Sequence, residues 1–250
     1  MLKTKCLKEQ KRNKTDIGDF RGIDRNALFL LELNKFNDSK DFYETVKEEI
    51  KQGAIVPMRL LASDLSEELY KIDPKMNLIP TKMVSRIRRD TRRSKNKELY
   101  RANVWCMFMR DKHQYRYQPC MWFEFYPGSY SYGIGIFGSD PKIMSIYREH
   151  MLNNQKKYKA AISSIEKFGA FPDVFPYKKP KDGYDEIEKG LKPYFNTKYI
   201  YFCKTGTDME NLFNGKIYDE LSEAIKVFTP FYKLLLEVHE KSIEKGDLNE

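Results

Sequence analysis

The first third of the chain carries apolar residues at steps of three and four, a pattern typical of amphipathic helices. A short helix is predicted over residues 24–35, with Asp24 as its N-cap. A second helix is predicted to begin at Asp38, which would be its N-cap, and to run to about residue 52. The folded part of the chain is therefore expected to begin with helices.

Two residues are expected to interrupt or kink this helical pattern. Gly53 adds backbone freedom, and Pro57 cannot donate the hydrogen bond of a helix interior. After Pro57 the apolar steps resume on one face of a further helix, which Asp73-Pro74 is expected to end. That face consists of Met58, Leu61, Leu65, Leu69 and Ile72.

The period then changes to the two-residue alternation of β-strands. Strands are predicted over residues 82–90, 103–109, 120–126 and 130–137. The short Pro127-Gly128-Ser129 segment between the last two predicts a turn, so these two strands should form an antiparallel hairpin. The middle of the chain is therefore expected to form an antiparallel sheet.

Helical spacing returns in the last part of the chain. Asp140 and Pro141 are a good N-cap and first residue for a helix of about 141–153, and another helix is predicted to follow as far as Phe168. The clearest element is the last one, an amphipathic helix that Pro230 should bend. Its apolar face consists of Ile217, Leu221, Ala224, Phe228, Phe231, Leu235 and Val238.

The order of helices, strands and helices predicts an α+β fold, with an antiparallel sheet core flanked by N-terminal and C-terminal helices. The 250 residues are 41% hydrophobic, which is too apolar for a disordered chain. With 32% charged residues and no apolar run near ~20 residues, no membrane span is expected. We expect a single domain over residues 21–245, preceded by a mobile basic tail over 1–20.

The positive charge is concentrated in one segment. The chain has a formal net charge of +9, and residues 86–101 hold eight Lys and Arg against two acids, a net of +6. The four cysteines form no CxxC element, and the three histidines show no zinc-ligand spacing. Free thiols without an export signal predict a cytoplasmic protein, and no metal or cofactor is expected.

Several segments together resemble a known family. The run RIRRDTRRSKNKELYR over residues 86–101 resembles the R-I-x-R-D-x-R-F-S-K-D-K-x-P-Y-K signature of the domain of unknown function 2461 family, conserved hypothetical proteins of bacteria and fungi. Residues 37–43, 123–135 and 179–184 are similar to further segments of that family. The resemblance implies a single α+β domain. It implies no activity, because the family's function is not established, and it identifies no catalytic residue.

The basic segment is the strongest local signal for a binding site. Arginine forks match the geometry of phosphate and carboxylate groups, and clustered cations create a positive potential. The alternative is a solvated loop whose arginines pair with acids, for example Arg92 with Asp90. The candidate ligand-binding residues are Arg86, Arg89, Asp90, Arg92, Ser94, Lys95, Lys97 and Tyr100.

Glu124 is the candidate catalytic residue, because it is the one charged residue within the apolar run 120–126. If that strand buries Glu124, the carboxylate should pair with an arginine of the basic segment. In that case the two features would share one site. The alternative is that Glu124 lies on the solvent side of the sheet.

These features favour a protein that binds an anionic ligand, either a phosphate-bearing small molecule or a nucleic acid, in an arginine-lined cleft on or beside the sheet. One alternative is an enzyme that acts on such a substrate, with Arg89 and Arg92 stabilising negative charge and Glu124 as acid or base. A second alternative is an interaction module for acidic protein partners. Whether the protein is an enzyme, and its oligomeric state, stay open at this point.

Overall fold

The computed structural model describes residues 20–111, 117–138 and 140–244. The basic tail predicted over residues 1–20 lies outside this part of the chain, except for Phe20. Contacts between Cα atoms divide the chain into two compact units, and each unit is built from three separate segments. Unit 1 consists of Met1–Phe108, Phe123–Ser131 and Gly206–Ser222, and unit 2 of Met109–Trp122, Tyr132–Thr205 and Glu223–Glu250.

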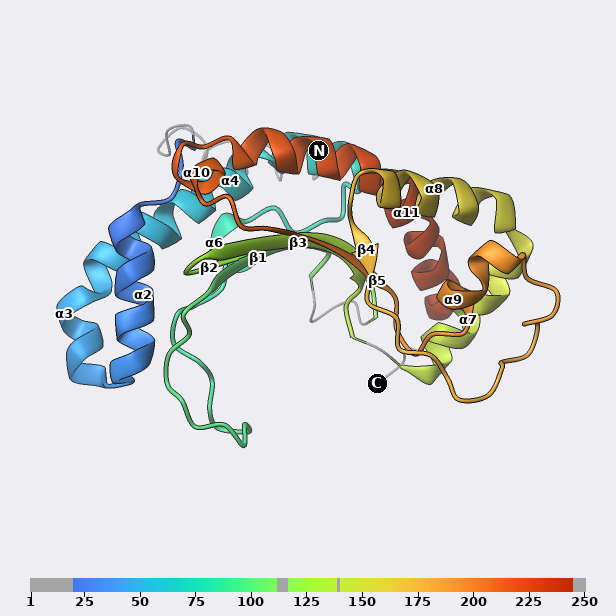
Figure 1. Ribbon diagram of the computed structural model, residues 1–250, viewed down its shortest axis with the longest axis horizontal. Coiled ribbons are helices and arrows are strands. Elements are labelled where there is room, and N and C mark those ends of the chain that lie inside the picture. Colours follow the sequence, from blue (N-terminus) through green and yellow to red (C-terminus); the bar gives the residue numbers. More distant parts are fainter. Residues whose placement is uncertain (1–19, 112–116, 139, 245–250) are drawn as a thin grey trace, which may run out of the picture. The chain divides into compact units, whose positions relative to one another are not determined.

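A five-stranded antiparallel sheet has the strand order β1-β2-β3-β5-β4 (Figure 1). The hairpin of β2 and β3 turns at Pro127-Gly128, where Gly128 has a φ of 96° that favours glycine. The sheet and its flanking helices confirm the predicted α+β class, and three of the four predicted strands are present. The strands are β1 (Val104–Phe108), β2 (Pro119–Tyr126), β3 (Ser129–Ile136), β4 (Phe171–Pro172) and β5 (Tyr201–Gly206).

Unit 1 begins with helices, as predicted. The side chain of Asp24 accepts a hydrogen bond from the Ala27 N–H at 3.0 Å and caps the first of them. The helices of unit 1 are α2 (Arg25–Asn37), α3 (Lys40–Ile50), the π-helix η1 (Lys51–Ile55), α4 (Val56–Asp64), α5 (Ser66–Ile72), α6 (Pro80–Met83) and α10 (Glu210–Phe213). Helix α11 (Ile217–Glu244) also begins in this unit.

Two details of the second helix differ from the prediction. Its N-cap is Ser39, whose hydroxyl accepts from the Phe42 N–H at 3.1 Å, whereas Asp38 is the left-handed C-cap of α2. At Gly53 the α-helical pattern gives way to the π-helix η1, but the helical path does not end, because η1 joins α3 directly to α4. Pro57 has no N–H to donate to the Gly53 carbonyl four residues earlier, and that carbonyl instead accepts from the Asp24 N–H at 2.9 Å.

The strand predicted over residues 82–90 is wrong. Helix α6 takes up its first part, and the Val84 N–H bonds to the Pro80 carbonyl at 3.1 Å, so a helical turn continues as far as Val84. Beyond it, only isolated antiparallel bridges form, Val84 with Cys106 and Arg88 with Tyr100. The predicted apolar face after Pro57 is confirmed, since Met58, Leu61, Leu65 and Leu69 are buried, while Ile72 is half-buried.

Unit 2 packs helices against its part of the sheet. Phe228 and Phe231 of α11 lie against Tyr132 of β3 and Phe202 of β5, with ring centroids 6.5 and 5.2 Å apart. Pro230 lies inside α11, and every residue of the predicted apolar face is buried. The other elements of unit 2 are α7 (Pro141–Asn153), capped by Asp140 as predicted, α8 (Gln155–Lys167), the 3-10 helix η2 (Lys189–Leu191) and α9 (Lys192–Phe195).

None of the helices in the described residues is both long enough and apolar enough to cross a membrane.

Candidate functional site

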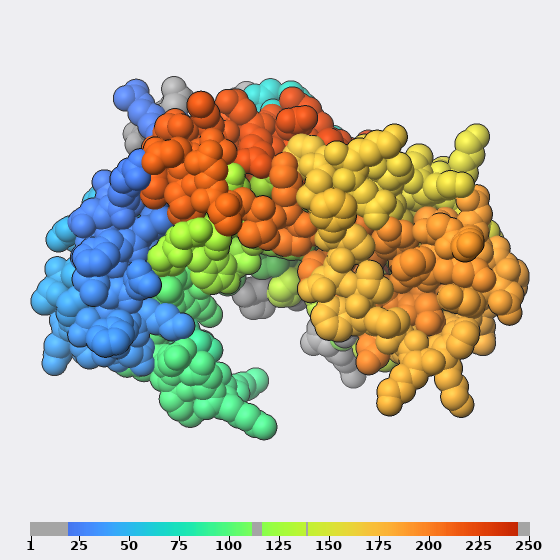
Figure 2. Space-filling model, in the orientation of Figure 1, coloured from blue at the N-terminus to red at the C-terminus, as the bar shows by residue number. Residues whose placement is uncertain are grey.

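Residues 86–101, here called the basic loop, form a hairpin-like excursion of unit 1. Its two arms are joined by backbone hydrogen bonds, from Arg89 N–H to the Leu99 carbonyl at 2.8 Å and from Arg101 N–H to the Ile87 carbonyl at 3.1 Å. At the tip, the Ser94 N–H reaches the Thr91 carbonyl at 3.3 Å. The tip extends away from the helices of unit 1 and is open to solvent on the side shown in Figure 2.

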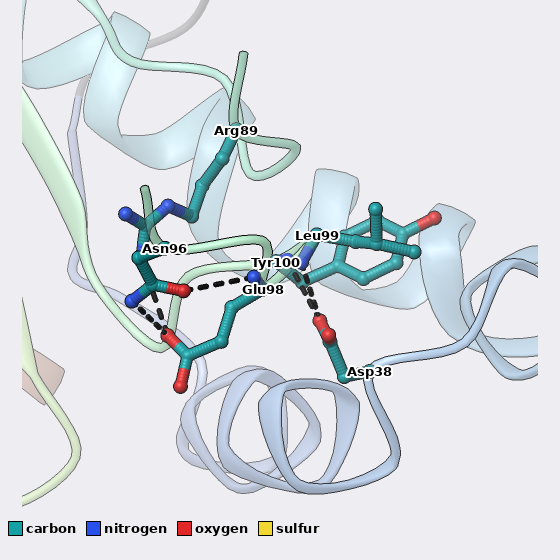
Figure 3. Close-up of polar contacts among 6 residues, drawn as sticks. All are labelled: Asp38, Arg89, Asn96, Glu98, Leu99 and Tyr100. Atoms are coloured by element: carbon teal, nitrogen blue, oxygen red, sulfur yellow. Dashed lines mark hydrogen bonds and ion pairs between the residues drawn. The ribbon is translucent and has the colours of Figure 1, made fainter. Parts of the chain in front are cut away.

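The base of the loop is fixed to unit 1 by Asp38 (Figure 3). One carboxylate oxygen accepts from the backbone N–H groups of Leu99 and Tyr100, at 2.8 and 3.0 Å. The Tyr100 ring is 1% exposed and stacks on Tyr43 with centroids 4.6 Å apart. Burial raises the pKa of Tyr100. Tyr100 was predicted to bind a ligand, but its ring lies in the core and anchors the loop.

Two arginines of the loop pair with its two acids. Arg89 lies 3.2 Å from Glu98, which also accepts a hydrogen bond from the Asn96 side chain at 3.1 Å. Arg92 binds both carboxylate oxygens of Asp90, at 2.9 and 2.7 Å. These hydrogen bonds from Arg92 lower the pKa of Asp90 to about 2. Arg89 and Arg92 therefore follow the alternative prediction, in which arginines of a solvated loop pair with nearby acids.

The other cations of the loop are not paired with acids in this way. Lys97 Nζ donates to the Thr91 carbonyl at 2.9 Å, and Arg101 donates to the Arg86 carbonyl at 2.9 Å, so their hydrogen-bond acceptors are neutral. Four exposed cations of the basic loop have side chains with neither a hydrogen bond nor an acid within 4.0 Å among the described residues. These are Arg86, Arg88, Arg93 and Lys95. The loop therefore keeps most of its positive charge available to solvent.

Glu124 lies on β2, facing away from the buried residues Phe123 and Phe125, and it is half-buried. Its carboxylate accepts hydrogen bonds from Asn103 Nδ2 at 3.3 Å, from the Tyr126 hydroxyl at 3.1 Å and from the Ser131 hydroxyl at 3.0 Å. All three partners are neutral. Burial and the nearby carboxylate raise the pKa of Tyr126.

The ion pair expected between Glu124 and the basic loop is not formed. Among the described residues, no guanidinium lies within 4.0 Å of the Glu124 carboxylate. Strand alternation places Glu124 on the face of β2 away from the buried side chains. There its carboxylate accepts hydrogen bonds from neutral side chains of the neighbouring segments, Asn103 and Ser131. The loop and Glu124 therefore do not form one ion-paired site.

A hollow that the sequence analysis missed lies at the N-terminus of α2. Its volume is about 670 Å³, and its charged and polar lining includes Arg21, Asp24, Arg25, Asn26, Glu49 and Gln52. Two of these lining residues already have charged partners, because Arg25 pairs with Glu210 outside the lining and Asn26 bonds to Glu49 at 3.3 Å. No run of like charge in the sequence marks this hollow, since its lining comes from three separate segments.

A metal centre is not indicated by the part of the chain that the structure describes, where no group of three or more His, Cys, Asp or Glu side chains could hold an ion. Cys106 and Cys120 are buried, as expected for small core residues, whereas Cys203 is half-buried.

Comparison with known proteins agrees with the resemblance noted from the sequence. The chain matches the family described as conserved hypothetical protein (DUF2461) over residues 26–234, which includes the basic loop, β2, β3 and most of α11. No curated protein matches it.

Proposed function

Because the chain belongs to the DUF2461 family, whose description gives no activity, we propose from the geometry alone that the basic loop binds the phosphate backbone of a nucleic acid. The observation that carries this proposal is the set of exposed cations without acid partners on a protruding loop. The predicted site was a cleft, whereas an open loop suits a long polyanion that lies across it better than a small ligand that needs enclosure.

The arrangement of the charges supports an extended ligand. Arg86 and Arg88 are exposed on either side of the buried Ile87, so alternation directs both to solvent from one arm of the loop. Arg93 and Lys95 place two more cations at the tip. Contacts of this kind neutralise phosphates and position the ligand, but they read no bases, so we expect little sequence preference.

An enzyme that uses Glu124 and an arginine together has less support, because the partners of the Glu124 carboxylate are Asn103, Tyr126 and Ser131. An acidic protein partner would use the same exposed cations as a nucleic acid. It is therefore included below as an outcome of the binding experiment.

The test is a binding titration with fluorescent single-stranded RNA, single-stranded DNA and duplex DNA over a range of salt concentrations. Eight cations minus two neutralised by Asp90 and Glu98 leave about six, and for duplex DNA this predicts a slope of log affinity against log salt near −5. Replacing Arg88 and Arg93 with Ala should weaken binding to all three nucleic acids and reduce the slope by about 2.

The matched control replaces Lys75 and Lys216, two cations of unit 1 outside the loop, with Ala, which changes the net charge by the same amount. The control should retain most of the affinity and slope. Equal losses in both double variants, or no dependence on salt, would contradict the proposal. Binding of labelled poly-glutamate without any nucleic-acid binding would favour an acidic protein partner instead.

A further inference from the structure

Unit 2 contains a buried arginine without an acid partner. Arg148 lies on α7 and is only 8% exposed. Its Nη1 atom is buried and has no hydrogen-bond acceptor, and no carboxylate lies within 4.0 Å of the side chain among the described residues. The contact that the structure gives this guanidinium is the Tyr177 ring, whose centroid is 5.6 Å from Cζ.

This arrangement is costly in the absence of an anion. A guanidinium stays protonated at any physiological pH, so Arg148 cannot escape burial by losing its charge. A buried charge normally requires a paired charge and hydrogen bonds to its donors. The face of Tyr177 offsets part of this cost through a cation–π contact, but it provides no acceptor for the N–H groups.

A second cation lies at the same ring. Lys181 Nζ is 4.1 Å from the centroid of Tyr177, so both Arg148 and Lys181 contact one aromatic side chain. Lys181 is half-buried and, unlike the lysines of the ion pairs in this structure, has no acid partner within 4.0 Å in the described chain. Two positive charges therefore lie against one ring, and neither has an acid within 4.0 Å among the described residues.

The segment that carries Tyr177 and Lys181 is held in place by Asn196. The Asn196 side chain accepts from the Lys181 N–H at 3.2 Å and donates to the Tyr177 carbonyl at 3.2 Å, and its own carbonyl accepts from the Tyr177 N–H at 2.9 Å. Gly183 then turns the chain with a φ of 85°, and the Tyr184 N–H closes the turn onto the Lys181 carbonyl at 3.0 Å. These hydrogen bonds thus fix the backbone that carries Tyr177 and Lys181.

We propose that Arg148, Tyr177 and Lys181 form a binding site for the phosphate group of a small phosphomonoester. A phosphomonoester carries about −1.5 to −2 charges at neutral pH, which matches two cations, whereas a carboxylate would neutralise only one. Its oxygens supply the acceptors that Arg148 Nη1 lacks, in the bidentate geometry that guanidinium groups favour. This site is separate from the proposed function of the basic loop, because all of its residues belong to unit 2.

The experiment measures binding of inorganic phosphate and glycerol phosphate to the full chain by calorimetry, with acetate at equal ionic strength as the carboxylate probe. The wild-type protein should bind both phosphates and bind acetate much more weakly. Replacing Arg148 with Met, which keeps the apolar stem and removes the charge, should lower phosphate affinity by roughly tenfold to a hundredfold, the loss expected for hydrogen bonds to a charged group.

Three further variants make the result specific. Arg148→Lys keeps the charge and loses the fork, and Lys181→Met removes the second cation, so both should weaken phosphate binding. Lys178→Met is the control, because Lys178 is an exposed cation of the same segment, and it should bind phosphate as the wild type does. If Arg148→Met fails to fold, Arg148→Lys and Lys181→Met still decide the question.

The proposal is overturned if the wild type shows no saturable binding at millimolar phosphate, or if the Arg148 and Lys181 variants bind as tightly as the control. Acetate binding as strong as phosphate binding would overturn the assignment to phosphomonoesters. Loss of nucleic-acid binding in the basic-loop variants has no effect on any of these outcomes, so the two proposals fail separately.

Discussion

The basic loop and Arg148 show two opposite ways for a protein to hold positive charge. The loop carries eight cations within residues 86–101 and leaves most of them in solvent, where a charge has little desolvation cost. Arg148 is a single cation that is 8% exposed and whose Nη1 has no acceptor. The loop thus attracts anions over a distance through its summed charge. Arg148 can bind only a single anionic group, by direct hydrogen bonds whose direction the buried guanidinium fixes.

Exposed and buried charges also differ in how much they affect ligand binding and folding stability. In water an ion pair contributes little to folding, because solvent and salt screen it. When a polar group is buried, each missing partner carries a cost. The stability of the protein should therefore depend on its few buried polar contacts much more than on the many charges of the basic loop.

The largest effect on stability is expected at Asp38, whose polar contacts hold the base of the loop to the body of unit 1. Replacing Asp38 with Ala leaves the N–H groups of Leu99 and Tyr100 without their acceptor and should lower the free energy of unfolding by about 2–3 kcal/mol. Urea denaturation measures this. Asp38→Asn keeps an acceptor oxygen and tolerates the left-handed backbone, so it should lose much less. Equal losses in the two variants would contradict the role of the acceptor.

The next effect concerns His150, a buried group of unit 2. Its ring nitrogens lie 2.9 Å from the Tyr158 hydroxyl and 3.0 Å from Glu237 Oε2. Burial lowers the pKa of His150, against the opposing effect of Glu237, while Lys241 and Lys157 add to the lowering. The unfolded chain therefore takes up a proton at a higher pH than the folded protein does.

It follows that stability from His150 is fully present above a pH of about 6.5 and is lost as the pH falls through the lower, folded pKa. Urea midpoints measured from pH 8 to pH 5 should decline, and His150→Gln should flatten that decline. A variant that declines as steeply as the wild type would show that other groups cause the pH dependence.

The smallest effect on stability is expected from the exposed pair of Asp90 and Arg92. The Asp90 carboxyl should titrate with a pKa of about 2 when followed by NMR, and Arg92→Ala should return the pKa to the ordinary range for aspartate. Any stability from this pair is present above the unfolded pKa and is lost as the pH falls towards 2. The urea midpoint at neutral pH should be unchanged in Arg92→Ala. A clearly lower midpoint would contradict the view that exposed charges contribute little to stability.

The sequence was enough to predict helices and turns that are fixed by residues close to one another in the chain. Asp24 and Asp140 each cap a helix through an N–H two or three residues ahead, and the hairpin of β2 and β3 follows from alternation around Pro127-Gly128. The choice between Asp38 and Ser39 as N-cap could not be made in this way. Both residues can cap a helix, but the Asp38 side chain is used by N–H groups 61 and 62 residues further along the chain.

The candidate site shows the same limit. The density of Lys and Arg marks the basic loop directly, so its position could be predicted, although the pairing of Arg89 and the burial of Tyr100 could not. Arg148 looks like an ordinary surface residue of an amphipathic helix, because its burial depends on a segment near Tyr177 that folds back onto α7. Glu124 was recognisable as unusual, but its partners depend on which residues of neighbouring segments face it.

The way the chain is divided between the two units has a consequence for synthesis on the ribosome. Unit 1 includes Gly206–Ser222, and unit 2 resumes at Glu223, so neither unit has all of its described residues until the ribosome has passed Ser222. Domains often fold one after another as they emerge, the N-terminal one first. This chain cannot follow that order fully, because the first helices of unit 1 must wait for Gly206–Ser222. Until that segment has been made, the apolar faces of these helices should stay exposed and prone to aggregation.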